Sequence, residues 1–478
     1  MDTINVALTD QHRPIPNIRT RTFFIVKARL DADAMKTALD TLIRDHWRKL
    51  GGRLHLNTST GFYEYHVPQT FKPASEYELF RWSTSTKTGL IDAAVPKLMK
   101  TPGPEDCEGT SGVAFLPAVT DYDHEFRPDS WPYHLEDDPA DTPILFFHLT
   151  FYDDATVVAI SLPHVVGDQL GTASLMRGWM NVLAGKAPPP MMDEDPLPHG
   201  REWSQLSKEE ARKKGAMHVR SSGEYIFVIL GFIPDMVFHK EEANHIMFIP
   251  MALVKSLRAR FHKELEANGG DPGISDNDVI TAVMCKFSRI HKGPMTITLG
   301  QSVNLRGRFS SMTGPAVGGF LHNGMAHASS RFHMTKKTPL SEIASHNRHA
   351  IDEVLTPEGA EVHLAIAREM VRRKQTLHIC EPFERSYSIT SWPAAWKDLD
   401  FSPAVVGYSE LEKSQQETHK PPELFVIGRG GERKTPHRFH ATVMFRNDAG
   451  YWLDMGVTLQ CIAAIKAHLA KDPSLENL

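Results

Sequence analysis

The sequence predicts an α/β (α+β) protein built as two lobes, and three observations lead to this prediction. The chain has 478 residues, whereas a single hydrophobic core stops growing beyond roughly 250–300 residues. Strand-like runs alternate along the chain with segments of helical periodicity. Near the middle, GKAPPPMMDEDPLP is followed by the charged stretch SKEEARKK, which is typical of a connecting segment. We therefore expect an N-terminal lobe over residues 1–184, a crossover over 185–244 and a C-terminal lobe over 245–478.

The first lobe is predicted to begin with a strand over residues 22–28. A helix follows, because apolar residues recur near every 3.6 positions at Met35, Leu39, Leu42 and Ile43. Asp31 or Asp33 is expected to cap the start of this helix.

The end of the first lobe contains a predicted hairpin. Residues 144–152 and 155–162 are strand-like and are separated by Asp153 and Asp154. Pro163 ends the second strand, and residues 170–183 then have a helical pattern. The second lobe repeats this mixture, with strands expected at 245–249, 295–299, 424–427 and 439–445 and helices at 253–265, 278–290 and 457–469.

The longest apolar stretch runs from Tyr225 to Phe238 and is interrupted by Gly231 and Pro234. It is too short to span a bilayer, which takes about 20 residues. We interpret it as a buried segment, with contact at a membrane surface as the alternative.

Composition and charge narrow the function classes. The net charge is −5 and no long basic run is present, so we expect no nucleic-acid partner. The four cysteines form no C-x-x-C pair, which argues against a zinc site or a redox motif and favours a reduced compartment. The first residues lack the apolar core of a signal peptide. We expect a cytoplasmic monomer with no metal and no stable membrane insertion.

The most informative segment is AISLPHVVGDQLG, residues 159–171. It places His164 and Asp168 four residues apart, between a predicted strand and a predicted helix. Transfer of an acyl group to a hydroxyl needs a base beside the attacking oxygen, and histidine suits this role because its pKa lies near neutral pH. A hydrogen-bonded core histidine is the alternative interpretation of His164.

The same H-x-x-x-D string occurs a second time, from His134 to Asp138 in SWPYHLEDDPADTP. This copy has no predicted strand before it and no predicted helix after it. We interpret it as solvated surface loop without a catalytic role.

Six segments, taken in order, resemble the BAHD acyltransferases, and in particular their fungal branch. They are LTDQ with Leu8 and Asp10, WRKLGGRL (47–54), SLPHVVGD (161–168), GISDNDVITAVMCKFSRI (273–290), SVNLRGR (302–308), and SITSW (388–392) with LDFSPA (399–404). Where the family has D-F-G-W-G, this chain has Asp400-Phe401-Ser402-Pro403-Ala404. Because proline fixes φ, we expect residues 399–407 to form an irregular loop away from His164, with Phe401 packed at the lobe interface.

The resemblance implies two chloramphenicol-acetyltransferase-like lobes, each a mixed sheet with flanking helices, and an active site in a tunnel between them. It implies an acyl-coenzyme A donor, here acetyl-coenzyme A, and a small hydroxylated acceptor of the terpenoid or polyketide type. His164 would be the general base, with no acyl-enzyme. Asp168 would pair with Arg306, or with Arg308 as the alternative.

Other site residues are also implied by the resemblance. Thr390 and Trp392 lie where the family places an oxyanion donor, with core packing as the alternative for Trp392. Asn323, in FLHNGM, is a site candidate. Ser275 would bind a coenzyme A phosphate at a helix start, or would be a simple N-cap.

Three other functions are considered from the sequence. A condensation-type enzyme that uses a carrier protein has two adjacent histidines, whereas Pro163 precedes His164 here. A hydrolase is disfavoured because no G-x-S-x-G motif occurs. The altered Asp400–Ala404 segment favours a non-acylating protein on the same scaffold.

Overall fold

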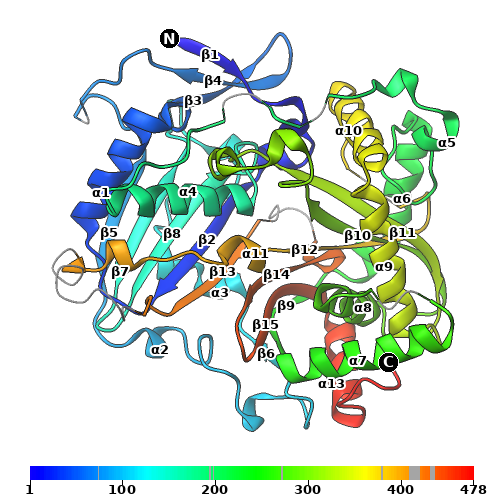
Figure 1. The fold of residues 1–478 in the computed structure, drawn as a ribbon. Coiled ribbons are helices and arrows are strands. Elements are labelled where there is room, and N and C mark those ends of the chain that lie inside the picture. The colour runs from blue at the N-terminus through cyan, green and yellow to red at the C-terminus, as the bar shows by residue number, and fades with distance from the viewer. Residues whose placement is uncertain are drawn as a thin grey trace.

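The computed structural model contains two large sheets that lie side by side and a small third sheet (Figure 1). It describes residues 1–73, 75–192, 195–197, 199–270, 273–377, 380–408, 420–430 and 436–478. The two-lobed α/β architecture expected from the sequence is confirmed by these sheets and their flanking helices.

The first lobe is built on a five-stranded sheet. Its strand order is β13 (Leu424–Arg429), β2 (Arg19–Val26), β8 (Thr156–Pro163), β7 (Phe146–Phe151) and β5 (Arg81–Thr86). The helices of this lobe are α1 (Ala32–Thr41), α2 (Ile91–Ala94), α3 (Val119–Phe126) and α4 (Gln169–Leu183). Asp31 caps α1 by accepting hydrogen bonds from two backbone N–H groups. The core behind α1 and α4 holds Leu39, Trp179 and the fully buried strands β2 and β8.

The second lobe is built on a seven-stranded sheet. Its strand order is β11 (Met325–Met334), β10 (Met295–Asn304), β12 (Arg385–Ser391), β14 (His440–Arg446), β15 (Gly450–Thr458), β9 (Glu242–Pro250) and β6 (Ala114–Leu116). Its longer helices are α7 (Met251–Ala267), α8 (Asp276–Ser288), α9 (Leu340–Val354), α10 (Pro357–Arg372) and α13 (Leu459–Lys471). The third sheet has the order β1 (Asp2–Asn5), β4 (Phe62–Val67) and β3 (Arg53–Asn57).

The two large sheets exchange strands, so they do not follow the division at residues 184 and 245. Strand β6 comes from the first third of the chain and pairs with β9 of the second lobe. Strand β13 comes from the last quarter and pairs antiparallel with β2 of the first lobe, Leu424 opposite Val26. The short helix α11 (Pro393–Trp396) precedes β13, and Trp396 packs edge-on against Phe24. This exchange ties the two lobes to each other.

The described part of the crossover contains helices. Helices α5 (Lys208–Ala211) and α6 (Ser222–Phe238) lie on the outer side of the second lobe (Figure 1). The expectation that residues 225–238 are buried is wrong, because α6 lies at the edge of the fold and only one side of it contacts the protein. Only Val228 and Gly231 of this helix are buried. None of the helices in the described parts of the chain is long and apolar enough to cross a membrane.

The segment that replaces D-F-G-W-G forms a short 3-10 turn, η10 (Ser402–Ala404). Asp400 Oδ1 accepts hydrogen bonds from the Ser402 N–H (2.8 Å) and hydroxyl (2.6 Å). Phe401 is buried in a core cluster that holds residues of both lobes, and its ring centroid lies 5.8 Å from that of Phe24. The Ala404 carbonyl accepts from the Asp31 N–H, so this segment closes one end of the first lobe.

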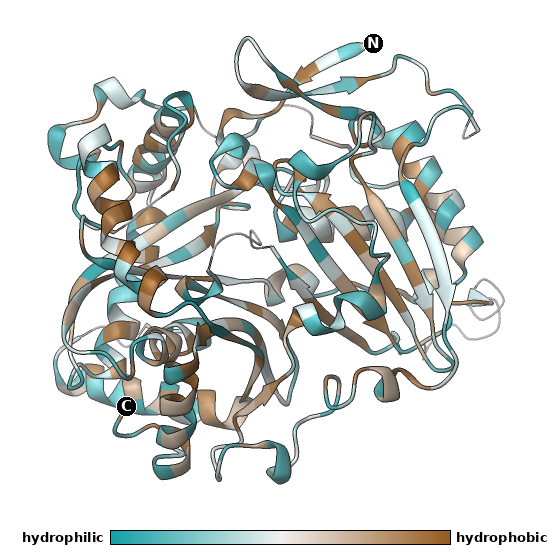
Figure 2. Cartoon of the chain, turned by 180° about the vertical axis from the view of Figure 1, so that it is seen from behind, coloured by the Kyte–Doolittle hydropathy of each residue, from teal (hydrophilic) through white to brown (hydrophobic). Residues whose placement is uncertain are grey.

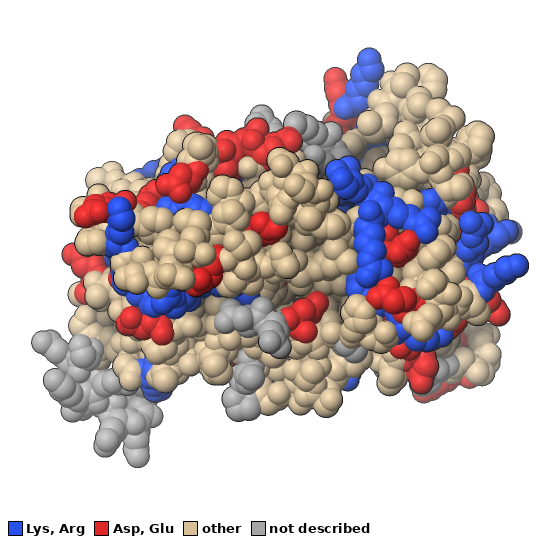
Figure 3. Space-filling model, turned by 90° about the horizontal axis from the view of Figure 1, so that it is seen from above, with Lys and Arg blue, Asp and Glu red and all other residues tan. Residues whose placement is uncertain are grey.

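Charges on the surface are mixed in sign. In the view from above, where β1 and β4 lie, Lys and Arg side chains alternate with Asp and Glu (Figure 3). All four cysteines are free thiols, three of them buried.

Candidate active site

His164 lies in the short turn between β8 and α4, where the first lobe meets the second. Its backbone N–H donates to the Ile18 carbonyl (2.8 Å) and its carbonyl accepts from the Asn323 side-chain amide (2.9 Å). Gly167 and Gly171 allow this turn to approach the second lobe, because a Cβ at either position would lie within 2.2 Å of the Leu321 carbonyl oxygen. The turn is therefore held from both lobes.

The imidazole of His164 keeps some accessible surface, while most of its surroundings are protein. Its Nδ1 is buried and has no hydrogen-bond partner among the described residues. Burial lowers the pKa of His164 because it disfavours the charged imidazolium, and the Asp168 and Asp10 carboxylates partly offset this effect. The ring is thus kept neutral and able to accept a proton at neutral pH.

The Asp168 carboxylate accepts four hydrogen bonds from backbone N–H groups and Arg306. Its Oδ1 accepts from the Gly171 N–H (2.8 Å), which makes Asp168 the N-cap of α4. Two nitrogens of Arg306 each donate to one carboxylate oxygen at 2.8 Å, and the Gly324 N–H donates to Oδ2 at 3.1 Å. Both charged side chains are 6% exposed. A bidentate, buried pair of this kind is among the strongest polar contacts in proteins.

Arg306 is therefore the arginine that contacts Asp168, and Arg308 is exposed. Arg306 also donates to the His322 carbonyl (2.6 Å) and lies over the Phe320 ring. Since Arg306 follows β10 and Asp168 precedes α4, this ion pair links the two lobes four residues after His164.

Sequence reasoning missed a second buried network that adjoins the first. Asp10 accepts from His322 Nδ1 (2.7 Å) and from the Asn323 N–H (3.0 Å), and Lys49 Nζ lies 2.9 Å from His322 Nε2. Asp10 and Lys49 come from the motif-like segments LTDQ and WRKLGGRL, so their presence in those segments was the available signal. The network positions Asn323, which in turn holds the His164 carbonyl.

The other predicted site residues are placed as follows. Thr390 is the penultimate residue of β12 and is partly exposed, and its hydroxyl has no hydrogen bond to a described residue. Trp392 is 7% exposed and packs against Gly428 of β13, which agrees with core packing. Ser275 precedes α8, and its hydroxyl and N–H donate to Asp278 at 2.7 and 2.8 Å. These contacts favour the N-cap role of Ser275.

The second H-x-x-x-D copy was expected to be solvated, and this expectation is wrong. His134 is 3% exposed and its Nδ1 lies 3.2 Å from Asp137 Oδ2. The loop packs on the start of β2 through a backbone bridge between His134 and Ile18. Burial of the histidine follows from this packing.

Two cavities flank the turn η1 (Leu8–Gln11), which carries Asp10. The larger one, about 550 Å³, is lined by Leu8, Tyr63, Asp195 and His322 among others. The smaller one, about 20 Å³, is lined by Asn323 and by His12, His327 and His363. Burial lowers the pKa of all three histidines, that of His327 to about 4. Their rings are therefore neutral, polar walls beside the residue that holds His164.

Comparisons with known proteins agree with this arrangement. Residues 124–414 match the Transferase family. Acetyltransferase adrJ of Penicillium rubens is 26% identical to this chain, over 84% of this chain and 81% of that protein. Transcriptional regulator sdnM of Sordaria araneosa is also 26% identical, over 88% and 87%.

A structural comparison gives the same fold. The crystal structure of Fusarium graminearum TRI101, complexed with coenzyme A and deoxynivalenol, superimposes with a TM-score of 0.64 at 13% identity, over 98% of this chain and 97% of that one. The family match covers more than half of the sequence and includes both His164 and Arg306. The chain therefore belongs to the Transferase family, that of the BAHD-type acyltransferases, and to its fungal branch.

Proposed function

We propose that this protein is an acyl-coenzyme A-dependent O-acyltransferase that acetylates a hydroxyl of a small secondary metabolite of the terpenoid or polyketide type. The observation that carries this proposal is the state of His164. Its ring is neutral and partly accessible, while its backbone is fixed from both lobes by Ile18 and Asn323. A base in a fixed position is what removal of a proton from an alcohol requires.

In the proposed reaction, the His164 imidazole takes the proton of the acceptor hydroxyl while the oxygen attacks the thioester carbonyl. The imidazolium then returns this proton to the departing thiolate, so no acyl-enzyme forms. Thr390, whose hydroxyl is free of contacts with described residues, is the better candidate for the donor to the oxyanion, since Trp392 is packed in the core. Asp168 and Arg306 position the turn and do not take part in the chemistry.

The names of the compared proteins support the choice of substrates. AdrJ is named an acetyltransferase, and the TRI101 crystals contain coenzyme A and deoxynivalenol. We assign Asn323 a positioning role, and we keep Ser275 as a weaker candidate for coenzyme binding. We infer a cytoplasmic monomer without a metal from the sequence alone.

A turnover experiment tests the proposal. The protein is incubated with acetyl-coenzyme A and a panel of hydroxylated terpenoids and polyketides, and the products are separated and weighed by mass spectrometry. We expect at least one acceptor to gain a single acetyl group, and longer acyl-coenzyme A donors to react more slowly. Absence of product with every donor, in a protein that still binds coenzyme A, would contradict the proposal.

The second candidate is a non-acylating protein on the same scaffold. One relative of similar identity is named a transcriptional regulator, and the Asp400–Ala404 segment departs from the family pattern. The position of His164 argues against this candidate, since a scaffold without chemistry has no need of a neutral, accessible imidazole at the lobe junction. The turnover experiment also tests the carrier-protein alternative. An enzyme that takes its acyl group from a carrier protein would not react with free acetyl-coenzyme A.

A further inference from the structure

Helix α6 carries an exposed apolar surface that the proposed chemistry does not use. Among the described residues, nine of the fourteen exposed large hydrophobic side chains lie here, each 42–78% exposed. We call this surface the α6 patch. It consists of Ile226, Phe227, Ile229, Leu230, Ile233, Met236, Val237 and Phe238 of α6, and of Phe383, whose ring lies 5.7 Å from that of Phe227. Apolar patches of this kind mark interaction sites.

The patch covers more than half of the helix circumference. At 100° per residue, the exposed positions from Met236 round to Phe238 span an arc of about 200°. The opposite side faces the protein. There a Cβ on Gly231 would lie 3.0 Å from the Phe383 Cα, and Phe232 packs on Phe439. The apolar turns of α6 therefore stand out from the edge of the second lobe, as the hydropathy colours show (Figure 2).

The outer surface of α6 is also uncharged. The one acidic residue between Ile226 and Phe238 is Asp235, and it turns inward to Arg385 at 2.9 Å and Arg289 at 3.9 Å. Glu224, in the first turn, accepts from the Ser221 N–H and pairs with His218. No carboxylate of this helix therefore opposes contact with an apolar or anionic surface.

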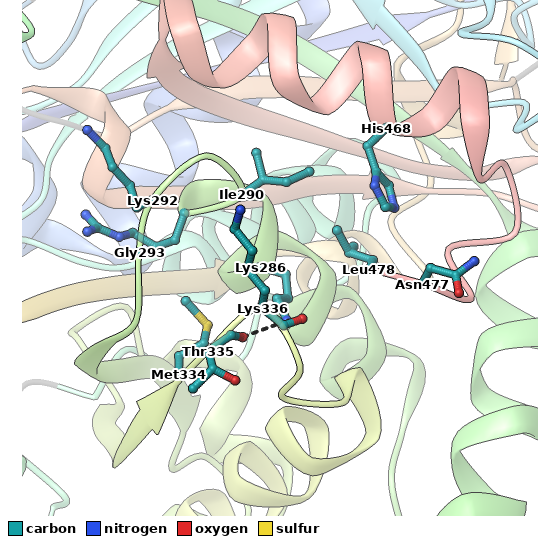
Figure 4. A pocket seen from close by; sticks show the side chains of 11 residues that line it. Lys286, Ile290, Lys292, Gly293, Met334, Thr335, Lys336, His468, Asn477 and Leu478 are labelled. Carbon is teal, nitrogen blue, oxygen red and sulfur yellow. Dashed lines mark hydrogen bonds between the residues drawn. The ribbon is translucent and has the colours of Figure 1, made fainter.

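Figure 4 shows a basic pocket of about 160 Å³, two of whose residues, Arg289 and Lys292, also contact the C-terminal end of α6. Its lining includes Lys286, Arg289, Lys292, Lys336 and His468, and none of its described side chains is Asp or Glu. Lys286 Nζ donates to the Thr335 and Lys336 carbonyls at 3.0 and 3.1 Å. Leu478 also lines the pocket.

Direct contacts join the basic pocket to α6 and to the residue that follows it. Lys292 Nζ lies 2.8 Å from Nε2 of His239, the residue that follows Phe238. Arg289 reaches back to Asp235 within the helix. Burial lowers the pKa of Lys286 and Lys292, and the neighbouring Arg289 adds to this effect at Lys292. An anion in the pocket would relieve the repulsion among these cations.

We propose that the α6 patch and the basic pocket together dock the protein on the surface of an anionic membrane, with the α6 side chains among the lipid headgroups and upper acyl chains and a lipid phosphate in the pocket. Interfacial helices bind by this combination of buried apolar area and attraction to anionic lipid. An isolated interfacial helix has a polar face of its own that stays in water. In this protein the rest of the second lobe, against which α6 packs, stays in water instead.

Two features favour a membrane over a protein partner. A rigid protein surface contacts only one side of a helix. A fluid lipid interface, in contrast, can stay in contact with exposed side chains over the whole arc of about 200° that the α6 patch covers. The patch itself offers no charged group for the polar rim that protein interfaces have. A second copy of this chain is the competing occupant, and the experiment separates the two.

The experiment is vesicle flotation of the full chain with phosphatidylcholine vesicles that contain or lack phosphatidylserine. We expect wild-type protein to float with the anionic vesicles, and less so as salt rises. The double variant Leu230→Glu/Ile233→Glu should reduce the partition coefficient at least tenfold. Lys292→Gln and Lys336→Gln should each reduce it about fivefold, and only with phosphatidylserine present.

Matched controls lie away from the α6 patch. Leu56→Glu changes a leucine that is 52% exposed, and Lys36→Gln removes an exposed lysine of α1. Both should float as wild type does. Melting temperatures of all variants are compared, so that loss of binding is not confused with loss of folding.

Three results would overturn the proposal. One is wild-type protein that stays with the unbound fraction whatever the lipid. Another is a patch variant that floats as well as wild type. The third is a wild-type dimer in light scattering that Leu230→Glu/Ile233→Glu converts to a monomer, which would assign the patch to a second copy. None of these results depends on acyl transfer, because a water-soluble acceptor tests that reaction separately.

Discussion

The two H-x-x-x-D copies of this chain resemble each other more than their sequence context suggests. Asp138 forms a bidentate pair with Arg19, as Asp168 does with Arg306. Both histidines adjoin Ile18, one through its carbonyl and the other through a backbone bridge. The copies differ in what they connect. The pair of Asp138 lies within the first lobe, whereas that of Asp168 joins the two lobes.

The two histidine rings also differ in their hydrogen-bond partners. The His134 ring lies against the Asp137 carboxylate, while His164 Nδ1 has no partner among the described residues. The comparison teaches that the string itself marks a buried Asp–Arg anchor, and that chemistry arises where the anchored turn lies at the junction of the lobes. The following predictions test this difference, from the largest effect to the smallest.

Replacement of His164 by alanine should have the largest effect. A general base contributes about 10²–10⁴-fold to the rate, so kcat should fall by at least that factor. The melting temperature and coenzyme A binding should stay close to those of wild type, because the ring is only partly buried. Steady-state kinetics and calorimetry measure these quantities, and a variant with more than half of the wild-type kcat would contradict the assignment.

Removal of either aspartate should destabilise the fold, but only one should slow the reaction. Loss of one partner from a buried ion pair costs about 3–5 kcal/mol, so Asp168→Ala and Asp138→Ala should both lower the free energy of unfolding. Asp168→Ala should in addition lower kcat, since it releases the turn that carries His164. Chemical denaturation and kinetics of both variants provide the comparison.

A double-mutant cycle sharpens the same point. Asp168→Ala and Arg306→Ala should show a coupling energy, because they remove the two ends of one contact. Additive losses would mean that the pair does not contribute as a unit, and that the anchor lies elsewhere.

Replacement of His134 by alanine should leave kcat nearly unchanged. The buried ring fills space between the loop and β2, so we expect a loss of stability of about 0.5–3 kcal/mol. A large loss of activity with a small loss of stability would show that the catalytic role was assigned to the wrong histidine.

The pH dependence should report on the surroundings of His164. Its pKa lies below the ordinary value of 6.5 because burial disfavours the imidazolium. The neutral ring is the base, so kcat/KM should fall as the pH is lowered, with the midpoint of the acid limb below 6.5. An acid limb above that value would mean that carboxylates, not burial, dominate the environment of the ring.

The smallest effect is expected at the altered Asp400–Ala404 segment. Ser402→Gly/Ala404→Gly restores the glycines of the family pattern and removes the hydroxyl that donates to Asp400. Each glycine gives the unfolded chain more conformational freedom, which lowers the stability of the fold by about 0.5–1 kcal/mol per position. The melting temperature should therefore fall slightly. The substitution can alter the KM for the acyl-coenzyme A donor, whereas kcat should stay nearly constant.

Much of the fold follows from local sequence, and part of it does not. Strand β8 and helix α4 were predictable because a mostly apolar run ends at Pro163 and a helical pattern begins after Asp168. The placements of β6 and β13 in the sheet of the other lobe were not, since strand order depends on contacts distant in sequence. The exposure of α6 was missed for a related reason. An all-apolar run has no polar face to indicate which side meets solvent.

The site shows the same division. His164, Asp168 and Arg306 lie in recognisable segments, and the structure brings them together. Asp10 and Lys49 also lie in recognisable segments, but only the fold reveals that His322 links them. The burial of His134 could not be foreseen either, because the polarity of its loop hides the backbone bridge to Ile18.

Direct transfer through His164 is the central claim, and the release of free thiol from acetyl-coenzyme A tests it most directly. Thiol is followed with and without a hydroxylated acceptor, for wild type and His164→Ala, and the intact mass of the protein is measured in the same samples. The account predicts thiol release by wild type only when acceptor is present, almost none by His164→Ala, and no change in protein mass. Thiol release without acceptor, together with a protein that has gained an acetyl group, would contradict it.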